Sequence, residues 1–474
     1  MLVIRSATLG LFAGGALVRS WFMACDRPGF TGYPDARTFI IAADRSLFGH
    51  PCRPAGYPLF LRAVRHLDGR LSVTTAAQHA VGVLTASTLY FATTPFLTRR
   101  WLGLLPAGAV LLGGAQLFLE HSVMSEAPYT ALLSGALFCA TRSAGGRPAR
   151  AGPECAWLAG CGCALGASAA LRSSGVLSLP PLMAWTLCSP GCSARHRLAR
   201  VAALATGAAL ALGAYVTAQH AQTGAWSLIR TQGFTLYARM APIADPRRFS
   251  APPGTEALCE LSEPAGRPNP TWYMFSWPGA PALALFGPPP YPRDRTRRAG
   301  YDWPADRLLR SFAMTVLRRQ PRAYLASVGW SLVNYVRPHT GPPSAIGWDH
   351  RTLIAGLQNR QFEEAALDDL SAYYDTGRGA RSTQRHRLER YARAARLEGG
   401  PSAVLAVLSL AGWIGQSGSK RRAASLFAGS TLSMAASLAA LLFYDARYAT
   451  PIYGPLAAGA ALGIDRLLGG PLAA

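Results

Sequence analysis

Charge is scarce in this sequence, and lysine is almost absent. Only 15% of the 474 residues are charged, half are hydrophobic, and Lys420 is the single lysine. Acidic residues are outnumbered, with 24 Asp and Glu against 47 Lys and Arg, which gives a net charge of +23. The arginines are spread over short loops between apolar runs and one long polar loop. This distribution argues against nucleic-acid binding and is typical of a membrane protein whose basic loops face one side and attract anionic lipid.

Several common signatures are also missing. The sequence contains no nucleotide-binding glycine loop and no internal repeat. Cys161-Gly162-Cys163 is too closely spaced and too apolar for a zinc site. Most of the nine cysteines lie in apolar runs, where cysteine acts as a small hydrophobic residue. These absences leave the apolar runs themselves as the main structural signal.

Ten apolar runs come close to the ~20 residues that a helix needs to cross a bilayer. They cover residues 6–24, 75–97, 102–120, 124–142, 155–172, 175–189, 199–219, 401–417, 423–443 and 448–467, of which the sixth is short. We interpret the first run as a retained signal-anchor, because no clear cleavage site follows it. The pattern predicts an all-α polytopic membrane protein with about ten transmembrane helices.

Arginine-rich short loops predict which ends of these helices face the cytoplasm. The clusters lie at residues 99–100, 142–150, 195–200 and 420–422. They place the loops 25–74 and 220–400 outside, and so divide the chain into a transmembrane module (1–219), an extracytoplasmic loop region (220–400) and a second transmembrane module (401–474). The short apolar segment 324–336 cannot be a further span without moving the last cluster outside. We expect it to lie at the interface or to pack on the bundle.

The outer loops have helical segments of their own. In the long loop, residues 306–319 place Leu308, Leu309, Phe312 and Val316 on one face. Residues 352–397 read as a charged helical hairpin or pair, and the proline-rich stretch 242–300 as irregular structure. Cys25 and Cys52 in the first outer loop are compatible with a disulfide or with two free thiols, and Cys259 is a competing partner.

The first outer loop carries an acid in an unusual place. In "YPDARTFIIAADRSLFGHPCRPAGYPLFL" (residues 33–61), Asp35 follows a proline and opens a short amphipathic helix, expected over residues 36–47. One interpretation is that Asp35 only caps this helix and complements its dipole. The other is that it is a catalytic base at the membrane surface.

More polar groups gather on the same predicted face. The turn "EHSVMSEAPY" supplies Glu120, His121 and Glu126, the last of which could instead cap the fourth span. Arg172 and Arg447 lie at the outer ends of the fifth and tenth spans, where they either snorkel to the headgroups or bind phosphate. Acids and arginines together suit attack by a hydroxyl on a phosphate-activated group.

The ordered series of motifs resembles a known family. It comprises the 33–61 loop, "QHAVGVLTASTLY", "HSVMSEAPY", "ALRSSGVLSLPP" and "ARYATPIYGP", with a weaker match in "LLRSFAMTVLRRQPRAYL". The series resembles the C-type (GT-C) integral-membrane glycosyltransferase superfamily, which includes protein O-mannosyltransferases and lipid A aminoarabinose transferases. The protein mannosyltransferases usually carry two adjacent acids in the first loop, whereas Ala36 follows Asp35 here. The chain therefore departs from that branch.

The resemblance implies a polyprenyl-phosphate sugar donor and a catalytic acid in the first outer loop, which maps onto Asp35. The family's second acidic position maps onto Glu126. Some members use a divalent metal such as Mg²⁺ or Mn²⁺. Arg172 and Arg447 are then expected at the donor phosphate. His50, Tyr57, His121 and Tyr448 are expected to line the donor or acceptor pocket.

The expected function is a plasma-membrane glycosyltransferase that inverts the sugar and acts on the extracytoplasmic face. Its acceptor would be an envelope glycan, lipid or protein. The alternative is a non-catalytic transporter or flippase of lipid-linked glycans. A transporter places polar groups or broken helices near the bilayer midplane. Here the charges cluster at span ends, which favours the enzyme.

Overall fold

The computed structural model describes residues 2–144, 151–190, 192–275, 280–287, 303–337, 350–361, 363, 370–371, 373–375 and 384–469. Within these ranges every regular element is a helix, joined by short 3₁₀ turns. The transmembrane candidates are α1 (Leu2–Cys25), α4 (Leu71–Thr93), α5 (Leu104–Leu112), α6 (Gly114–Glu120), α7 (Glu126–Ala144), α8 (Ala151–Leu171), α9 (Leu179–Leu187), α10 (Ala194–Thr223), α20 (Gly400–Gly415), α21 (Gly418–Leu441) and α22 (Ala446–Leu467). The outer loops add α2 (Pro34–Asp44), α3 (Gly56–Leu67), α11 (Gln232–Met240), α12 (Pro270–Phe275), α13 (Pro281–Phe286), α14 (Pro304–Arg319), α15 (Pro321–Val333), α17 (His350–Leu357) and α19 (Arg385–Ala394).

A helix occupies each of the ten predicted apolar segments, although not all of these helices are long and apolar. By length and composition, four described helices can cross a membrane: Arg5–Cys25, Gly152–Leu171, Ala194–Thr223 and Gly418–Leu441. A fifth is added if the bent pair Arg100–Leu112 and Gly114–Glu120 counts as one span, whereas α20 is shorter. The count of ten spans and the three-module division therefore stay predictions.

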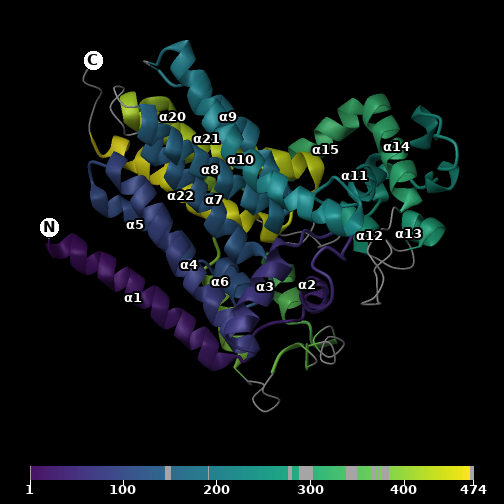
Figure 1. Cartoon of the computed structure of the whole chain (residues 1–474), viewed down its shortest axis with the longest axis horizontal. Helices are drawn as coiled ribbons and strands as arrows, with labels where there is room; N and C mark the ends of the chain where they lie inside the picture. The colour runs from purple at the N-terminus through teal and green to yellow at the C-terminus, as the bar shows by residue number, and fades with distance from the viewer. Residues whose placement is uncertain are drawn as a thin grey trace.

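The bundle is held together by close helix contacts. In Figure 1, α1 stands at the edge of the bundle; α7 packs on α21 and α22, and α8 packs between α7 and α10. The α8–α10 contact depends on two glycines, one on each helix, and each of them faces the backbone of the other helix. A Cβ at Gly162 would meet the Leu204 carbonyl oxygen at 2.0 Å, and one at Gly207 would meet the Ala159 oxygen at 2.0 Å. Small residues at such crossings allow the backbones to approach, which is how helices associate in lipid.

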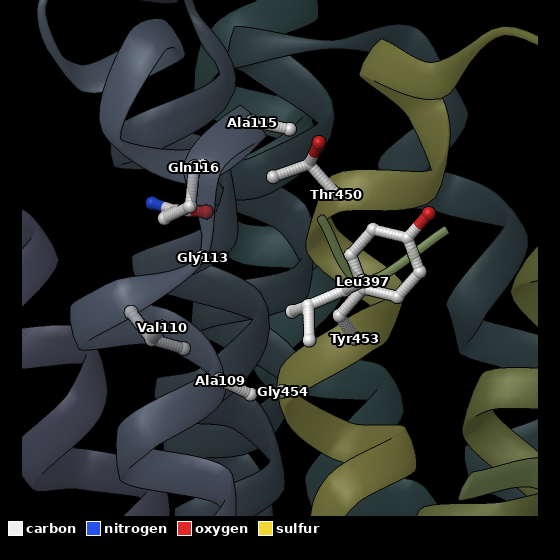
Figure 2. A pocket seen from close by; sticks show the side chains of 10 residues that line it. Ala109, Val110, Gly113, Ala115, Gln116, Leu397, Thr450, Tyr453 and Gly454 are labelled. Carbon is white, nitrogen blue, oxygen red and sulfur yellow. The ribbon is translucent and has the colours of Figure 1, made fainter. Parts of the chain in front are cut away.

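The third predicted span is not a single helix. It breaks at Gly113 with a bend of 50°, so that α5 and α6 point in different directions. A small cavity lies at this break, between α5, α6 and α22. Figure 2 shows Gln116 from α6 and Thr450 and Tyr453 from α22 beside it. Gly113 has φ −61° and ψ 123°, which is extended backbone and interrupts the helical hydrogen bonds.

The long outer loop folds around a core of its own. The predicted helix over 306–319 begins at Pro304, and Leu309, Phe312 and Val316 are buried in that core, whereas Leu308 is only half-buried. The predicted interfacial segment forms α15, where the Tyr324 hydroxyl donates to the Ala440 carbonyl near the end of α21.

The predicted hairpin over 352–397 is described only in part. Its two described helices, α17 and α19, both pack against α6, and the segment between them includes residues outside the described ranges. Most of the stretch 242–300 has short 3₁₀ turns and the short helices α12 and α13, while residues 276–279 and 288–302 lie outside the described part of the chain.

Candidate active site

Asp35 lies in the first turn of α2, which begins at Pro34 and ends at Asp44 rather than at residue 47. Its carboxylate is buried, and both oxygens accept hydrogen bonds from arginines. Arg53 Nη2 donates to Oδ1 at 2.5 Å, and Arg447 Nη1 donates to Oδ2 at 2.7 Å. These bonds connect α2 to the loop before α3 and to α22. Asp35 therefore makes no capping hydrogen bond to its own helix and bonds across the fold instead, while its place in the first turn still complements the helix dipole.

The start of α3 brings the first outer loop onto the bundle. A Cβ at Gly56 would meet the Ala170 carbonyl oxygen at 2.4 Å, so only glycine allows α3 to begin this close to the end of α8. Arg62 from α3 donates to the Ala43 carbonyl at 2.7 Å, and the Phe39 and Tyr57 rings pack 4.8 Å apart. These contacts fix α2 in place above the ends of α7, α8 and α22.

Arg447 is the centre of the site. It is buried in the first turn of α22, where Asp445 caps the helix by accepting from the Arg447 backbone N–H at 2.8 Å. Besides its bond to Asp35, the guanidinium lies 3.5 Å from Glu126 Oε1 and 3.7 Å from Asp445 Oδ2. One arginine therefore contacts three carboxylates from three separate segments.

Glu126 and Arg172 form the second ion pair of the site. Arg172 Nη1 donates to Glu126 Oε1 and lies 3.3 Å from Ser125 Oγ. Glu126 is buried at the start of α7, and Arg172 directly follows α8. Arg172 is thus directed at a carboxylate rather than only at the headgroups, and Glu126 reaches across to α8 as well as opening α7.

Aromatic rings enclose the arginines. The Arg447 guanidinium lies 5.0 Å from the Tyr448 ring centre and 4.7 Å from that of Tyr33, and its Nη2 donates to the Tyr448 hydroxyl at 3.2 Å. Arg172 lies 4.9 Å from the Tyr448 ring. Cation–π contacts in a desolvated site orient a guanidinium plane and leave its edge for a charged partner.

Two buried atoms of this site have no hydrogen-bond partner among the described residues. They are Glu126 Oε2, an acceptor, and Arg447 Nε, a donor. Leaving a buried charged atom unpaired is costly, and native proteins keep few such groups. The site therefore keeps an unused acceptor at Glu126 Oε2 and, at Arg447 Nε, a donor whose nearest carboxylate oxygen, Glu126 Oε1, is 3.5 Å away.

The two carboxyl groups Asp35 and Asp445 differ in the direction in which the site shifts their pKa. Burial opposes ionisation of Asp35, but the charges of Arg53 and Arg447 outweigh it and lower the pKa of this carboxyl. Burial raises the pKa of Asp445 to about 6, against the opposing charge of Arg447. Asp35 is thus a firmly ionised carboxylate, whereas Asp445 changes its protonation near neutral pH.

Two of the predicted pocket residues lie beside the site rather than in it. Burial, reinforced by the positive charge of Arg53, lowers the pKa of His50 to about 3, so His50 is neutral. Its Nδ1 accepts from the Cys52 backbone N–H at 3.1 Å. Tyr57 is buried in the core and donates to Gln78 Oε1 at 2.8 Å, without touching Asp35. Tyr448 is the pocket residue that contacts the arginines directly.

The structure places His121 in a buried network of its own, so its role in a donor or acceptor pocket stays a prediction. Its Nδ1 lies 3.1 Å from His79 Nε2, and its Nε2 lies 3.1 Å from the Asp26 carbonyl. His79 in turn contacts Glu120 at 3.0 Å, which pairs with Arg19 of α1. This network ties α1, α4 and α6 together, and Asp26 extends it to Arg385 of α19 at 2.8 Å.

Sequence reasoning missed Arg53 and Asp445, which both take part in the site. Arg53 lies in a proline-rich turn without periodicity, so no pattern indicated its partner. Asp445 stands two residues before Arg447, a spacing that could have identified a helix cap.

All cysteines of the described chain are free thiols. The Cys25–Cys52 disulfide is therefore not formed, and Cys25 Sγ lies 3.4 Å from Gln384 Oε1 instead.

The donor set of this site does not fit a divalent metal. Asp35 and Glu126 are occupied by arginines, whose positive charge disfavours a cation at the same oxygens. In the part of the chain that the structure describes, no three His, Cys, Asp or Glu side chains gather as metal ligands. We therefore derive no step through a metal.

Comparison with protein-family models and with curated proteins finds no match. Among solved structures, the chain is similar to ArnT from Cupriavidus metallidurans bound to undecaprenyl phosphate, with 15% identity over 98% of this chain and 78% of that chain, at a TM-score of 0.36. The apo ArnT structure gives 15% identity over 93% and 90%, at 0.38. The archaeal oligosaccharyltransferase AglB from Archaeoglobus fulgidus, in complex with an inhibitory peptide and a dolichol phosphate, gives 10% identity over 96% of this chain and half of that chain, at 0.45. Superpositions this loose do not decide function, which rests here on the site itself.

Proposed function

We propose that this chain is a membrane glycosyltransferase that moves a sugar from a polyprenyl-phosphate donor to a hydroxyl of a cell-envelope acceptor. The single observation that carries the proposal is the buried Arg447, which contacts Asp35, Glu126 and Asp445 and keeps an unpartnered N–H. Together with Arg53 and Arg172, it completes a set of three arginines and three carboxylates. Such a set can bind an anionic phosphate and also hold a carboxylate ready to accept a proton.

The donor phosphate is expected to bind the edges of Arg172 and Arg447. These guanidinium groups offer several N–H donors in a planar fork, which suits two phosphate oxygens at once. When Arg447 donates to the phosphate instead of to Asp35, Asp35 Oδ2 loses a hydrogen bond. The pKa of Asp35 then rises, and the carboxylate becomes a better base once the donor is in place.

The transfer step balances without a further reactant. Asp35 takes the proton of the acceptor hydroxyl, while the oxygen of that hydroxyl forms a bond to the anomeric carbon. The bond from that carbon to the phosphate oxygen breaks, and its electron pair leaves with polyprenyl phosphate, whose charge Arg172 and Arg447 stabilise. Attack opposite the leaving group inverts the anomeric configuration. Glu126 Oε2 is positioned to accept from a hydroxyl of the sugar or the acceptor.

The proposal is tested with purified protein in lipid nanodiscs and a set of polyprenyl-phosphate sugars. We expect release of polyprenyl phosphate that depends on one sugar donor and on added envelope extract. Mass spectrometry of envelope glycans from cells with and without the gene should show one sugar missing. A chain that releases no polyprenyl phosphate from any donor, and whose loss leaves the glycans unchanged, contradicts the proposal.

The pKa of Asp445 predicts how donor binding depends on pH. Because its folded pKa is raised above its ordinary value of 3.8 to about 6, its contribution to stability is fully present below that ordinary value and is lost as pH rises through about 6. A donor phosphate beside it raises this pKa further, so binding takes up a proton. The donor KM should therefore rise between about pH 6 and 7.5, by up to ~10-fold per pH unit.

The phosphodiester of the donor does not titrate in this range, so the effect is assigned to the protein. Asp445→Asn keeps the cap of α22, because Asn caps as well as Asp. We expect this variant to lose the pH dependence of KM. An Asp445→Asn enzyme with the wild-type slope contradicts the assignment.

A further inference from the structure

A second group of arginines lies at the end of the bundle opposite Asp35. It is formed by Arg197 and Arg200 near the start of α10 and by Arg422 in the first turn of α21, and we call it the basal cluster. The neighbouring helix α8 ends at Leu171, directly before Arg172 of the active site, and α21 ends at Leu441, four residues before Asp445. In Figure 1, α9 lies at the top of the bundle and α2 and α3 lie near its lower side. The sequence predicts that the basal cluster faces the cytoplasm.

Packing fixes the arginines of the basal cluster. Arg200 is only 1% exposed. The Arg422 guanidinium lies 4.7 Å from the Trp185 ring centre, while the Trp185 indole N–H donates to the Arg422 carbonyl at 3.1 Å. Arg422 also donates to Ser189 Oγ at the end of α9. Two guanidinium groups are thus held in defined orientations at the meeting point of four helices.

The negative charge nearby does not balance these cations. Glu154 at the start of α8 lies 3.6 Å from Arg200 Nη1, and it is also 3.6 Å from His196 Nε2. Arg422 interacts electrostatically with Arg200 as well as with Glu154, and the first of these interactions is repulsive. Among the described residues, Glu154 is therefore the one carboxylate that interacts with Arg200 and Arg422, and it is shared with His196.

The basal cluster also has buried donors without partners. Within the described ranges, the Nε–H groups of Arg197, Arg200 and Arg422 are all buried and donate to no hydrogen-bond acceptor. Arg197 and Arg200 are three residues apart on α10 and so share a face. A buried guanidinium N–H that stays unpaired is costly, and repulsion between Arg200 and Arg422 adds to that cost. One anion with several oxygens would remove both penalties.

We propose that the basal cluster binds a phosphate group, supplied by the headgroup of an anionic membrane lipid. The cluster lies at the ends of membrane-spanning candidates, where a headgroup phosphate is at hand. Guanidinium groups at fixed angles suit phosphate oxygens better than a point charge does. Basic pockets between helices on the cytoplasmic side favour anionic headgroups for the same reason. The lipid would thereby brace α8, α10 and α21, of which α8 ends directly before Arg172 of the active site.

The test measures thermal unfolding of the full chain in detergent, titrated with phosphatidylglycerol, phosphatidylcholine or inorganic phosphate. A ligand that binds the folded state raises the unfolding midpoint by mass action. We expect phosphatidylglycerol to stabilise the wild type, and phosphatidylcholine not to. Arg422→Gln should weaken the apparent affinity about tenfold, because it removes a charged hydrogen bond to phosphate.

Arg421→Gln is the matched control. Arg421 is exposed in the same turn of α21, so this variant loses the same charge but no group of the cluster. It should respond to phosphatidylglycerol like the wild type. If inorganic phosphate reproduces the whole effect with the same dependence on Arg422, the site is supported and its ligand is a soluble phosphate. Equal losses in the two variants, or equal stabilisation by the two lipids, overturn the proposal.

A second variant keeps the test decisive if Arg422→Gln fails to fold. Glu154→Gln removes the carboxylate that competes with the anion for Arg200. The basal cluster then carries one more net positive charge, so the response to phosphatidylglycerol should increase several-fold. A Glu154→Gln protein that responds like the wild type, or more weakly, contradicts a phosphate site at this position.

Discussion

Replacing Asp35 with Asn should lower the turnover of the sugar transfer by ~10²–10⁴-fold, the usual contribution of a general base. Asn keeps the size of the side chain and can still accept a hydrogen bond from Arg447 or Arg53, but it cannot take the acceptor proton. Turnover at saturating donor and acceptor is the quantity to measure. The thermal unfolding midpoint of the variant should be determined alongside it, so that a loss of folding is recognised.

Variants of two further carboxylates show whether Asp35 or another acid is the base. Asp44→Asn changes the last residue of α2 without touching the site, and it should turn over like the wild type. Glu126→Gln alters the carboxylate whose Oε2 is unpartnered, and we expect it to raise KM more than it lowers turnover. If Glu126→Gln loses the larger share of turnover while Asp35→Asn stays active, the base is Glu126 and our assignment is wrong. A dead Asp44→Asn enzyme would move the base to that residue.

Replacing Arg447 with Lys should lower kcat/KM for the donor by ~10–100-fold, because charged hydrogen bonds of this kind contribute about 1.5–3 kcal/mol. Lysine keeps the charge but cannot contact Asp35, Glu126 and Asp445 together, since it lacks the planar fork. The effect should be largest at limiting donor. Complete removal in Arg447→Met takes one arginine partner from Asp35 and Glu126 and the nearby guanidinium from buried Asp445, and should cost about 3–5 kcal/mol of stability.

Arg172→Lys and Arg466→Lys complete this series. The Arg172 side chain is 14% exposed, and its ion pair within the described ranges is with Glu126, so its replacement should weaken donor use less than that of Arg447. Arg466 lies at the far end of α22, and Arg466→Lys should leave the donor kinetics unchanged. If Arg447→Lys and Arg172→Lys both match the wild type at limiting donor, the two arginines do not bind the donor phosphate and only reach toward the headgroups.

The sequence predicted the helical elements well because apolar runs and turn residues are local signals. The expected helix over 306–319 differs from α14 only at its start. The break at Gly113 was not predicted, although the Gly113-Gly114 pair in the apolar run is a local signal for one. The hairpin over 352–397 lies partly outside the described residues, so that prediction stays open.

For the site, the sequence supplied most of the residues but few of their partners. Asp35, Glu126, Arg172 and Arg447 were selected because each stands at a span end on the same predicted face, and the structure brings these four side chains together. The same reasoning placed His121 with them, yet it lies in the network of His79 and Glu120. Their catalytic roles stay predictions until the variants above are measured.

By itself, the sequence determined an all-helical membrane bundle with acids and arginines gathered at one end of it, because helix formation and bilayer insertion depend on local composition. Only the tertiary structure decided which charges pair. The bond between Asp35 and Arg447 joins residues 412 positions apart, and it forms because glycine-mediated packing brings α3 onto α8 and so places α2 above α22. Such a pairing depends on distances of a few ångströms between helices, and no pattern along the chain encodes them.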